Sequence, residues 1–195
     1  MSPRDAIMTN IRGALAAGGS DEARRKAVEA RLSRPPKGVI PARGQLDDEA
    51  RVELFCEMAR RVTASVVRVR SHDRVPKAVS EYLRAKNLPS SIRIGDDRRL
   101  KSMPWDKFGS LEVRRGPSDG FDETGVSHAL AGIAETGTVA LASGKDNPTT
   151  INFLPEHHIV VIDATSIQGD LETAISGIRA RFGKGEMPRT VNLIS

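Results

Sequence analysis

Apolar residues follow two patterns along the chain, faces with helical spacing and short continuous runs. Helical spacing, with apolar side chains recurring every three to four residues, covers residues 47–62, 75–83 and 171–182. Runs that are typical of strands cover residues 66–69, 91–95, 111–114, 126–130, 138–142, 159–162 and 190–194. Strands that alternate with amphipathic helices predict an α/β domain with an open, mostly parallel sheet flanked by helices.

A basic helical arm precedes this domain. Ser2 and Asp5 have the spacing of a capping box at the start of a first helix, and a second helix is predicted over residues 21–32. Residues 1–43 hold nine Lys or Arg and four Asp or Glu, a balance of +5, whereas the rest of the chain holds 21 of each. We therefore expect an N-terminal arm and linker over residues 1–43 and one domain over residues 44–195. Because the excess charge lies outside the folded body, we expect a solvated or partner-binding arm and no nucleic-acid partner.

Composition narrows the classes of function. Hydrophobic residues make up 38% of the chain and charged residues 28%, as in ordinary soluble domains. Aromatic residues make up only 4%, so stacking platforms for single-stranded nucleic acid are scarce. The one cysteine, Cys56, cannot supply the roughly four thiolates of an iron–sulfur cluster. No secretory segment and no membrane span is evident, so we expect a cytoplasmic protein.

Candidate chemistry is densest between Gly132 and Asp163, where polar residues stand at the ends of two predicted strands. Strand ends in a buried sheet are where α/β proteins place ligand sites. Glu135 is the first candidate for catalysis, as a general base; the alternative is a carboxylate that accepts backbone hydrogen bonds and fixes a turn.

The residues that follow Glu135 are candidate substrate-binding groups. Gly137 would let the backbone approach a ligand closely or bend sharply. Thr136 and Thr138 could donate hydrogen bonds to an oxyanion or phosphate, although threonine is also simply a good strand residue.

A polar loop between the two strands holds three further substrate-binding candidates, Ser143, Gly144 and Asn147. With Lys145 this loop could close over a small anion, and an ordinary polar loop is an equally adequate interpretation. The Ser-Gly-Lys sequence is only a fragment of a phosphate loop, because Val139 stands where the Walker motif has its first glycine.

The adjacent pair His157 and His158 invites a metal interpretation. Neighbouring residues in a strand point to opposite faces, so the pair cannot readily chelate one ion, and no third ligand stands at a regular spacing. The sequence therefore predicts no metal site; we expect one of the two histidines to line the substrate site beside Glu135. His72 and His128 carry no signal of their own.

Two other features are interpreted as structural. Asp119, Asp122 and Glu123 lie close together, but their spacing does not match a calcium loop, so we expect a solvated loop. Trp105, the only tryptophan, is expected to pack a loop onto the core.

Three segments together resemble the signature of the LUD-domain family, in its lactate utilisation protein C form. They are Ile133-Ala134-Glu135-Thr136-Gly137-Thr138, Ser143-Gly144 and Leu154-Pro155-Glu156-His157-His158-Ile159. The resemblance extends more loosely over nearly the whole chain. It implies a fold similar to that of the sugar-phosphate isomerase and CoA-transferase superfamily. In related CoA transferases a glutamate attacks a thioester, which implies a nucleophilic role for Glu135.

The resemblance also implies a function. The first hypothesis is a subunit or accessory of an iron–sulfur oxidoreductase system that oxidises L-lactate to pyruvate. The clusters would then lie in two partner proteins, this chain would bind no cofactor, and a small carboxylate would be its substrate.

The alternative is a stand-alone transferase or isomerase that acts through Glu135 on a small anionic acyl or sugar-phosphate substrate. The sequence leaves open whether the chain is itself an enzyme. Family members usually continue past the strand at residues 190–194, so we expect an incomplete C-terminal end or a divergent member.

Overall fold

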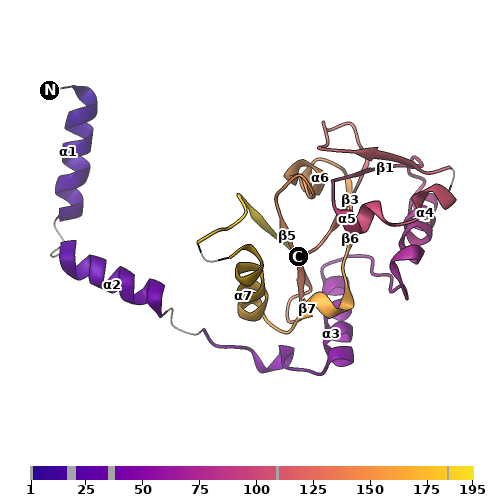
Figure 1. The fold of residues 1–195 in the computed structure, drawn as a ribbon, viewed down its shortest axis with the longest axis horizontal. Coiled ribbons are helices and arrows are strands. Elements are labelled where there is room, and N and C mark those ends of the chain that lie inside the picture. Colours follow the sequence, from indigo (N-terminus) through magenta and orange to yellow (C-terminus); the bar gives the residue numbers. More distant parts are fainter. Residues whose placement is uncertain (1, 17–20, 35–37, 109, 184) are drawn as a thin grey trace. The chain divides into compact units, whose positions relative to one another are not determined.

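The computed structural model describes residues 2–16, 21–34, 38–108, 110–183 and 185–195. Contacts within the chain divide it into two units, Met1–Val39 and Ile40–Ser195 (Figure 1). The second unit also includes residues 40–43, which the sequence analysis assigns to the arm and linker. Gly44, the first residue of the predicted domain, is packed on Gly169, where an added Cβ would lie 2.1 Å from the carbonyl oxygen.

The first unit consists of two helices, α1 (Pro3–Ala16) and α2 (Asp21–Ser33). The predicted capping box is present at the start of α1. The backbone N–H of Asp5 donates to Ser2 Oγ at 3.2 Å, and that of Ser2 donates to Asp5 Oδ2 at 3.1 Å. Among residues 2–15 and 21–34 no side chain is buried, so the described part of this unit has no core of its own.

A fully parallel sheet forms one half of the second unit. Its strands, in spatial order, are β2 (Glu112–Arg115), β1 (Ser91–Ile94), β3 (Thr124–His128) and β6 (His157–Val161). All three strand pairs run parallel, and β3 pairs with β6 along its whole length, from Thr124 beside His157 to His128 beside Val161. All four carboxyl ends therefore lie at one edge of this sheet, which we call the carboxyl edge.

A mixed sheet forms the other half. Its order is β7 (Ile167–Gln168), β4 (Ala131–Ile133), β5 (Thr138–Ala142) and β8 (Val191–Ile194). The β4–β7 pair is parallel, whereas β5 runs antiparallel to both β4 and β8. The α/β class with mostly parallel strands is confirmed, and the strands are divided between two sheets.

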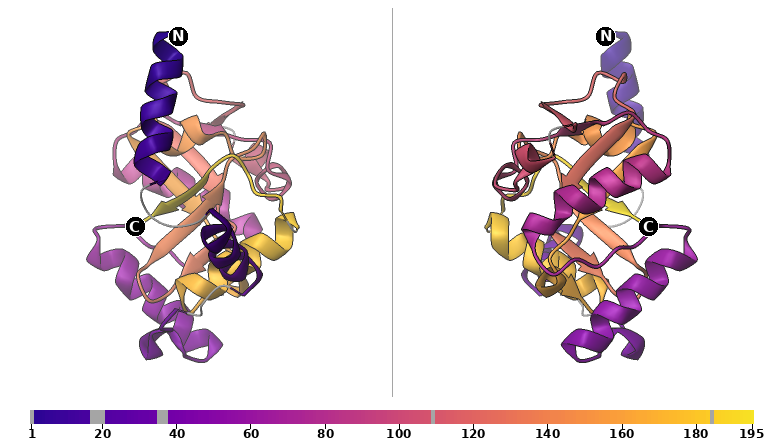
Figure 2. Two further views of the ribbon diagram at one scale, coloured as in Figure 1. Left: turned by 90° about the vertical axis from the view of Figure 1, so that its left-hand side faces the viewer. Right: turned by 90° about the vertical axis from the view of Figure 1, so that its right-hand side faces the viewer.

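Helices cover both faces of each sheet (Figures 1 and 2). Their bounds are α3 (Asp48–Arg61), α4 (Val75–Ala85), α5 (Arg98–Lys101), α6 (Thr149–Phe153) and α7 (Leu171–Phe182). Short 3-10 turns lie at Ala42–Gly44, His72–Arg74, Trp105–Lys107 and Ala164–Ser166. None of the helices in the described ranges is long and apolar enough to cross a membrane.

Successive side chains along a strand point to opposite faces of the sheet and so contact different helices. On β6, His157 reaches Tyr82 of α4, whereas the next residue, His158, reaches Ser127, which in turn bonds Asn152 of α6. The main core lies between α4 and the parallel sheet, with Leu83, Ile94 and Val126 at its centre. In the mixed sheet, α7 packs beside Ile133 and Ala140, and Phe55 of α3 approaches Gly132.

Two sequence predictions are wrong. Residues 66–69 do not form a strand: Val67 is 70% exposed, and Arg68 forms ion pairs with Glu49 and Glu53 of α3, so the segment follows that helix and joins no sheet. Asp122 is not solvated. It is 8% exposed because Arg93 and Ser118 hold its carboxylate, each at 2.8 Å.

Trp105 packs as expected. It is buried in the main core, and its indole N–H donates to the carbonyl of Leu100 at 2.6 Å.

Candidate functional site

Polar side chains gather at the carboxyl edge of the parallel sheet. His128 is the last residue of β3, Asp163 follows the end of β6, and Asp97 follows the end of β1. Open α/β sheets bind ligands just outside the carboxyl ends of their strands. The fold therefore marks this edge, rather than the amino edge, as the candidate site.

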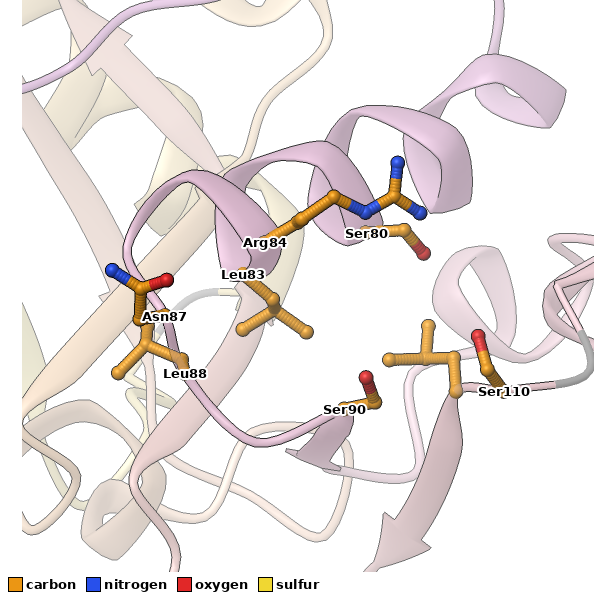
Figure 3. Close-up of a pocket in the computed structure, with 8 residues that line it drawn as sticks. Ser80, Leu83, Arg84, Asn87, Leu88, Ser90 and Ser110 are labelled. Atoms are coloured by element: carbon orange, nitrogen blue, oxygen red, sulfur yellow. The ribbon is translucent and has the colours of Figure 1, made fainter.

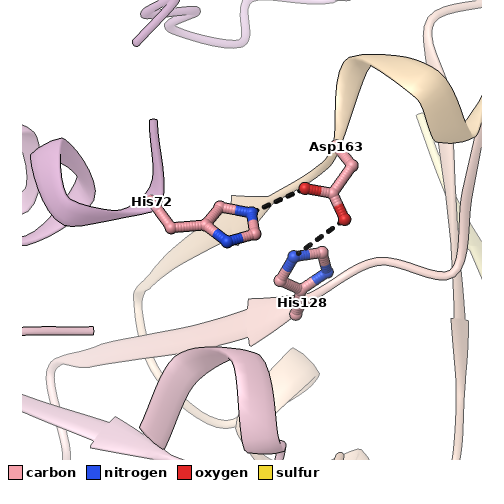
Figure 4. A group of neighbouring side chains, drawn as sticks. All are labelled: His72, His128 and Asp163. Atoms are coloured by element: carbon pink, nitrogen blue, oxygen red, sulfur yellow. Dashed lines mark hydrogen bonds and ion pairs between the residues drawn. The ribbon is translucent and has the colours of Figure 1, made fainter. Parts of the chain in front are cut away.

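Three side chains meet here, His72, His128 and Asp163 (Figure 4). The Nε2 atom of His72 lies 2.6 Å from Asp163 Oδ1, and the Nε2 atom of His128 lies 3.6 Å from Asp163 Oδ2. One atom from each residue can be chosen so that all three lie within 4.8 Å of one another. The carboxylate thus stands between the two imidazole rings and faces both.

Burial and a backbone contact determine the state of His128. Its side chain is fully buried, and Nδ1 lies 2.9 Å from the carbonyl oxygen of Ala129, which can only accept a hydrogen bond. Nδ1 therefore carries the proton. Burial lowers the pKa of His128 and outweighs the hydrogen bond to Ala129 and the nearby Asp163 and Asp97 carboxylates, which raise it, so the neutral ring is favoured. Nε2 then presents a lone pair, and it has no hydrogen-bond partner.

A second charged pair borders this group. Asp97 accepts hydrogen bonds from Arg99 at Oδ1 and Oδ2, with side-chain distances of 3.1 and 2.7 Å, and Oδ1 also accepts from the Arg99 backbone N–H at 2.8 Å. Burial alone would raise the pKa of Asp97, but these hydrogen bonds outweigh it and hold the pKa below its usual value. The negative charge of Asp97 and the positive charge of Arg99 offset each other, so this ion pair adds little net charge next to the histidines.

The polar loop predicted from the sequence reaches the same edge. The backbone N–H of Asp96 donates to the carbonyl of Lys145 at 3.0 Å, and a Cβ on Gly95 would meet the carbonyl oxygen of Asp146 at 2.1 Å. This contact brings the loop that holds Ser143, Gly144 and Asn147 against the end of β1.

The candidate side chains of this loop form hydrogen bonds to the backbone of the chain. Ser143 Oγ accepts the backbone N–H of Thr190 at 2.9 Å, and the buried Asn147 donates to the carbonyl of Ala142 at 3.2 Å. Asn147 Oδ1 is buried without a partner.

Glu135 and Gly137 lie at the opposite end of β5, in what we call the 135–138 turn. Glu135 is 6% exposed; its Oε1 accepts the backbone N–H of Leu171, the first residue of α7, at 3.2 Å. Gly137 has φ 70°, and an added Cβ would lie 2.4 Å from the backbone nitrogen of Ala59. Backbone from α3 and α7 thus encloses the turn.

The two threonines of this turn bond each other. Thr136 Oγ1 lies 2.7 Å from Thr138 Oγ1, which also contacts the hydroxyl of Ser195. The structure therefore does not bring residues 135–138 together with the loop at Ser143, and their roles in substrate binding stay predictions.

The histidine pair lies at the amino edge of the parallel sheet, beside Thr124 and Gly125. His157 Nδ1 lies 2.9 Å from Tyr82 Oη, and His158 Nε2 lies 3.0 Å from Ser127 Oγ, on the opposite face of the strand. Burial lowers the pKa of His158 to about 4. The structure places neither histidine beside Glu135.

A pocket of about 320 Å³ also lies at the amino edge, between the end of α4 and the segments that lead into β1 and β2 (Figure 3). Leu83, Arg84, Ser90 and Ser110 are among the side chains that line it. No histidine or carboxylate among the described residues lines it. We therefore base the candidate site on the carboxyl edge, where the titratable groups converge.

Sequence reasoning missed the group at the carboxyl edge. Asp163 follows the apolar run at residues 159–162, and this position was an available signal. His128 lies inside the strand that the sequence predicts over residues 126–130 and offered no such signal. His72 offers no such signal, because it reaches the edge from a turn that precedes α4.

Comparison with known proteins finds similarity in the C-terminal part of the chain. Residues 120–195 match the model of the LUD domain family, which confirms the predicted resemblance for that part. A lactate utilization protein C from Shouchella clausii is 29% identical over 73 residues, 37% of this chain and 32% of that protein. A lactate utilization protein C from a Geobacillus species is 32% identical over 72 residues, 36% of this chain and 30% of that protein. The match thus spans about a third of the length of these curated relatives.

A further relative and a solved structure extend the comparison. An uncharacterized protein from Neisseria meningitidis is 33% identical over 73 residues, 37% of this chain and 30% of that protein. The crystal structure of a DUF162 family protein from Deinococcus radiodurans has a TM-score of 0.62 and 20% identity, covering 76% of this chain and 88% of that one. This likeness confirms the fold.

Proposed function

With a LUD domain matched over residues 120–195 as the premise, we propose that this chain acts in lactate utilisation. Its part is that of a subunit or accessory of an iron–sulfur oxidoreductase system that oxidises L-lactate to pyruvate. The observation that carries the proposal is the match of this region to two proteins named lactate utilization protein C.

The single cysteine supports the assignment of redox centres to partners. An iron–sulfur cluster needs about four thiolates, and these 195 residues provide only Cys56, which is buried in α3. Burial also raises the pKa of Cys56, which keeps it in the thiol form that binds metals poorly. We therefore place the clusters in two iron–sulfur partner proteins.

The carboxyl edge supports a small, polar ligand for this chain. His128 and Asp163 lie there at strand ends, and His72 joins them from a turn. These groups can exchange hydrogen bonds with the hydroxyl and carboxyl oxygens of a small polar ligand such as a 2-hydroxy acid. The Asp163 side chain is 30% exposed and that of His72 is 47% exposed, so a ligand from solvent reaches the group.

Two measurements in the source organism test the proposal. A strain without this protein should lose growth on L-lactate as the sole carbon source while it keeps growth on pyruvate, since the block lies between the two. The tagged chain, purified from lactate-grown cells, should carry two iron–sulfur proteins with it and be colourless once they are removed. Normal growth on L-lactate together with the absence of such partners would contradict the proposal.

One observation favours the alternative, a transferase or isomerase that works through Glu135. Glu135 Oε2 is buried without a hydrogen-bond partner, so one carboxylate oxygen is free. Incubation of the isolated chain with an acyl-CoA and a small carboxylate tests the transferase form: thioester exchange that disappears in Glu135→Gln supports it, and no exchange in the wild-type chain rejects it. Incubation with sugar phosphates, with Glu135→Gln again as the comparison, tests the isomerase form in the same way.

A further inference from the structure

We propose that His72, His128 and Asp163 bind one divalent transition-metal ion, such as Zn²⁺, at the carboxyl edge of the parallel sheet. The inference rests on the geometry of the three side chains and is independent of the proposed role in lactate utilisation.

The hydrogen bonding of the His128 ring is that of a typical metal-ligating histidine. Metal-ligating histidines usually donate the other ring N–H to a carboxylate or backbone carbonyl, which fixes the tautomer and the ring orientation. In this chain Nδ1 donates to the carbonyl of Ala129 at 2.9 Å, and Nε2 is left buried with a lone pair and no partner. Buried polar atoms are rarely left unpaired, so the Nε2 atom calls for an explanation.

The atom that Nε2 faces is a carboxylate oxygen. Asp163 Oδ2 lies 3.6 Å away, too far for a hydrogen bond. Two lone pairs that face each other repel, whereas a cation between them attracts both. In a tetrahedral zinc site with bonds of about 2.0–2.1 Å, ligand atoms lie about 3.3 Å apart, close to this separation.

His72 supplies the third ligand from a turn rather than from the sheet. Its Nε2 atom now lies 2.6 Å from Asp163 Oδ1, so metal binding would replace this hydrogen bond with two bonds to the ion. The exposed His72 side chain can make this small shift, and His128 provides the rigid side of the site.

The donor set decides the class of metal. Two imidazole nitrogens and one carboxylate suit Zn²⁺ and other late first-row ions, whereas Ca²⁺ and Mg²⁺ require mostly oxygen ligands. Three protein ligands on a partly exposed group leave a coordination position open to water or a ligand, as in catalytic rather than structural zinc sites.

The surrounding charges permit a dication. Arg99 is the cation near His128, but Asp97 binds it at two oxygens, and Asp163 and Asp146 also lie close enough to Arg99 to raise its pKa. Three carboxylates therefore act on the one guanidinium beside His128.

Zinc titration by calorimetry on the full, tag-free chain tests the inference. Wild-type protein should bind one Zn²⁺, and Co²⁺ in its place should give the visible bands of a low-coordinate nitrogen and oxygen site. His72→Gln and Asp163→Asn alter partly exposed side chains, so the variants should fold. Each should weaken Zn²⁺ binding by at least about tenfold, since even outer-sphere changes at metal sites cost about 10- to 100-fold.

His157→Gln is the matched control, because it removes a histidine at the amino edge of the same sheet. It should bind Zn²⁺ as the wild type does. Absence of saturable binding by the wild-type chain, unchanged affinity in both site variants, or an equal loss in the His157 variant would each overturn the assignment.

Discussion

The 135–138 turn and the carboxyl edge of the parallel sheet each bury a polar atom without a hydrogen-bond partner. The two regions differ in the groups that surround that atom. At the turn, Glu135 Oε2 is buried, the other carboxylate oxygen accepts a backbone N–H of α7, and Gly137 lies against the backbone of α3. At the edge, His128 Nε2 faces a half-exposed carboxylate and a second histidine. The turn carries the more recognisable sequence, whereas the edge carries more groups that can act on a ligand.

This difference shows that a sequence signature can mark architecture as well as chemistry. The Glu135 carboxylate accepts the first N–H of α7 and adds a negative charge at the positive end of that helix. A glycine at φ 70° lets the same turn pass against α3. The predictions below, from the largest expected effect to the smallest, test whether the turn is structural and the edge functional.

Gly137→Ala should have the largest effect on stability. The new Cβ would add a left-handed backbone penalty to a clash with the α3 backbone at 2.4 Å, for a loss of about 2–5 kcal/mol. Gly116→Ala is the matched control, because Gly116 has φ 99° with open space around the Cβ position, so only the backbone penalty of about 1–2 kcal/mol applies. Equal losses in urea unfolding would show that the turn is not tightly enclosed.

Asp97→Asn tests the charged pair at the edge. Asn keeps an acceptor for the Arg99 backbone but loses the ion pair, and solvent at the partly exposed Arg99 limits the loss to about 1–2 kcal/mol. Because the pKa of Asp97 is lowered in the folded state, its stabilisation is complete above the unfolded pKa of about 3.9 and is lost as pH falls through the folded pKa.

The unfolding free energies of wild type and Asp97→Asn should therefore differ at pH 7 and converge in acid. Asp106→Asn changes an exposed carboxylate of the same domain and should have little effect at either pH. A difference that persists undiminished at about pH 2 would refute the pairing with Arg99.

Glu135→Gln should lower stability by about 1 kcal/mol, because it removes a buried charge at the start of α7. Glu172→Gln removes an exposed charge from the first turn of the same helix and should cost about 0.3 kcal/mol. If the turn is structural, lactate-dependent growth should survive the Glu135 change below the melting temperature. A stable variant that has lost growth on lactate would return Glu135 to the functional site.

Removal of residues 1–39 should have the smallest effect, since both regions lie within Ile40–Ser195. We expect a change of less than about 0.5 kcal/mol in the unfolding free energy of the domain. Removal through Gln45 should cost about 1 kcal/mol, because Gln45 donates to Asp170, the N-cap of α7, at 2.9 Å. A domain from Ile40 that fails to unfold cooperatively would show that the arm belongs to its core.

The sequence predicted the helices and strands better than the contacts between them. Local signals were sufficient for β5, whose bounds are as predicted, and for α7, which ends at Phe182 just before Gly183 with φ 94°. The division into two sheets was not accessible, because pairing between distant strands leaves no local pattern. For the same reason His72 reaches Asp163 across 91 positions without any periodic signal.

The candidate site was predicted only in part. The loop that holds Ser143, Gly144 and Asn147 lies against the end of β1 at the carboxyl edge, and its role in substrate binding stays a prediction. The distance in sequence between Glu135 and that loop is short, but β5 separates them in space because a strand is extended.

The most direct test of the carboxyl edge as the functional centre is crystallographic. Crystals of the full chain, soaked in Zn²⁺, would be measured at the zinc absorption edge to locate anomalous scattering. We predict one peak at about 2.0–2.2 Å from His128 Nε2, His72 Nε2 and one oxygen of Asp163. A map with zinc bound only elsewhere, for example at His157 and His158, or with none bound at all, would contradict the account.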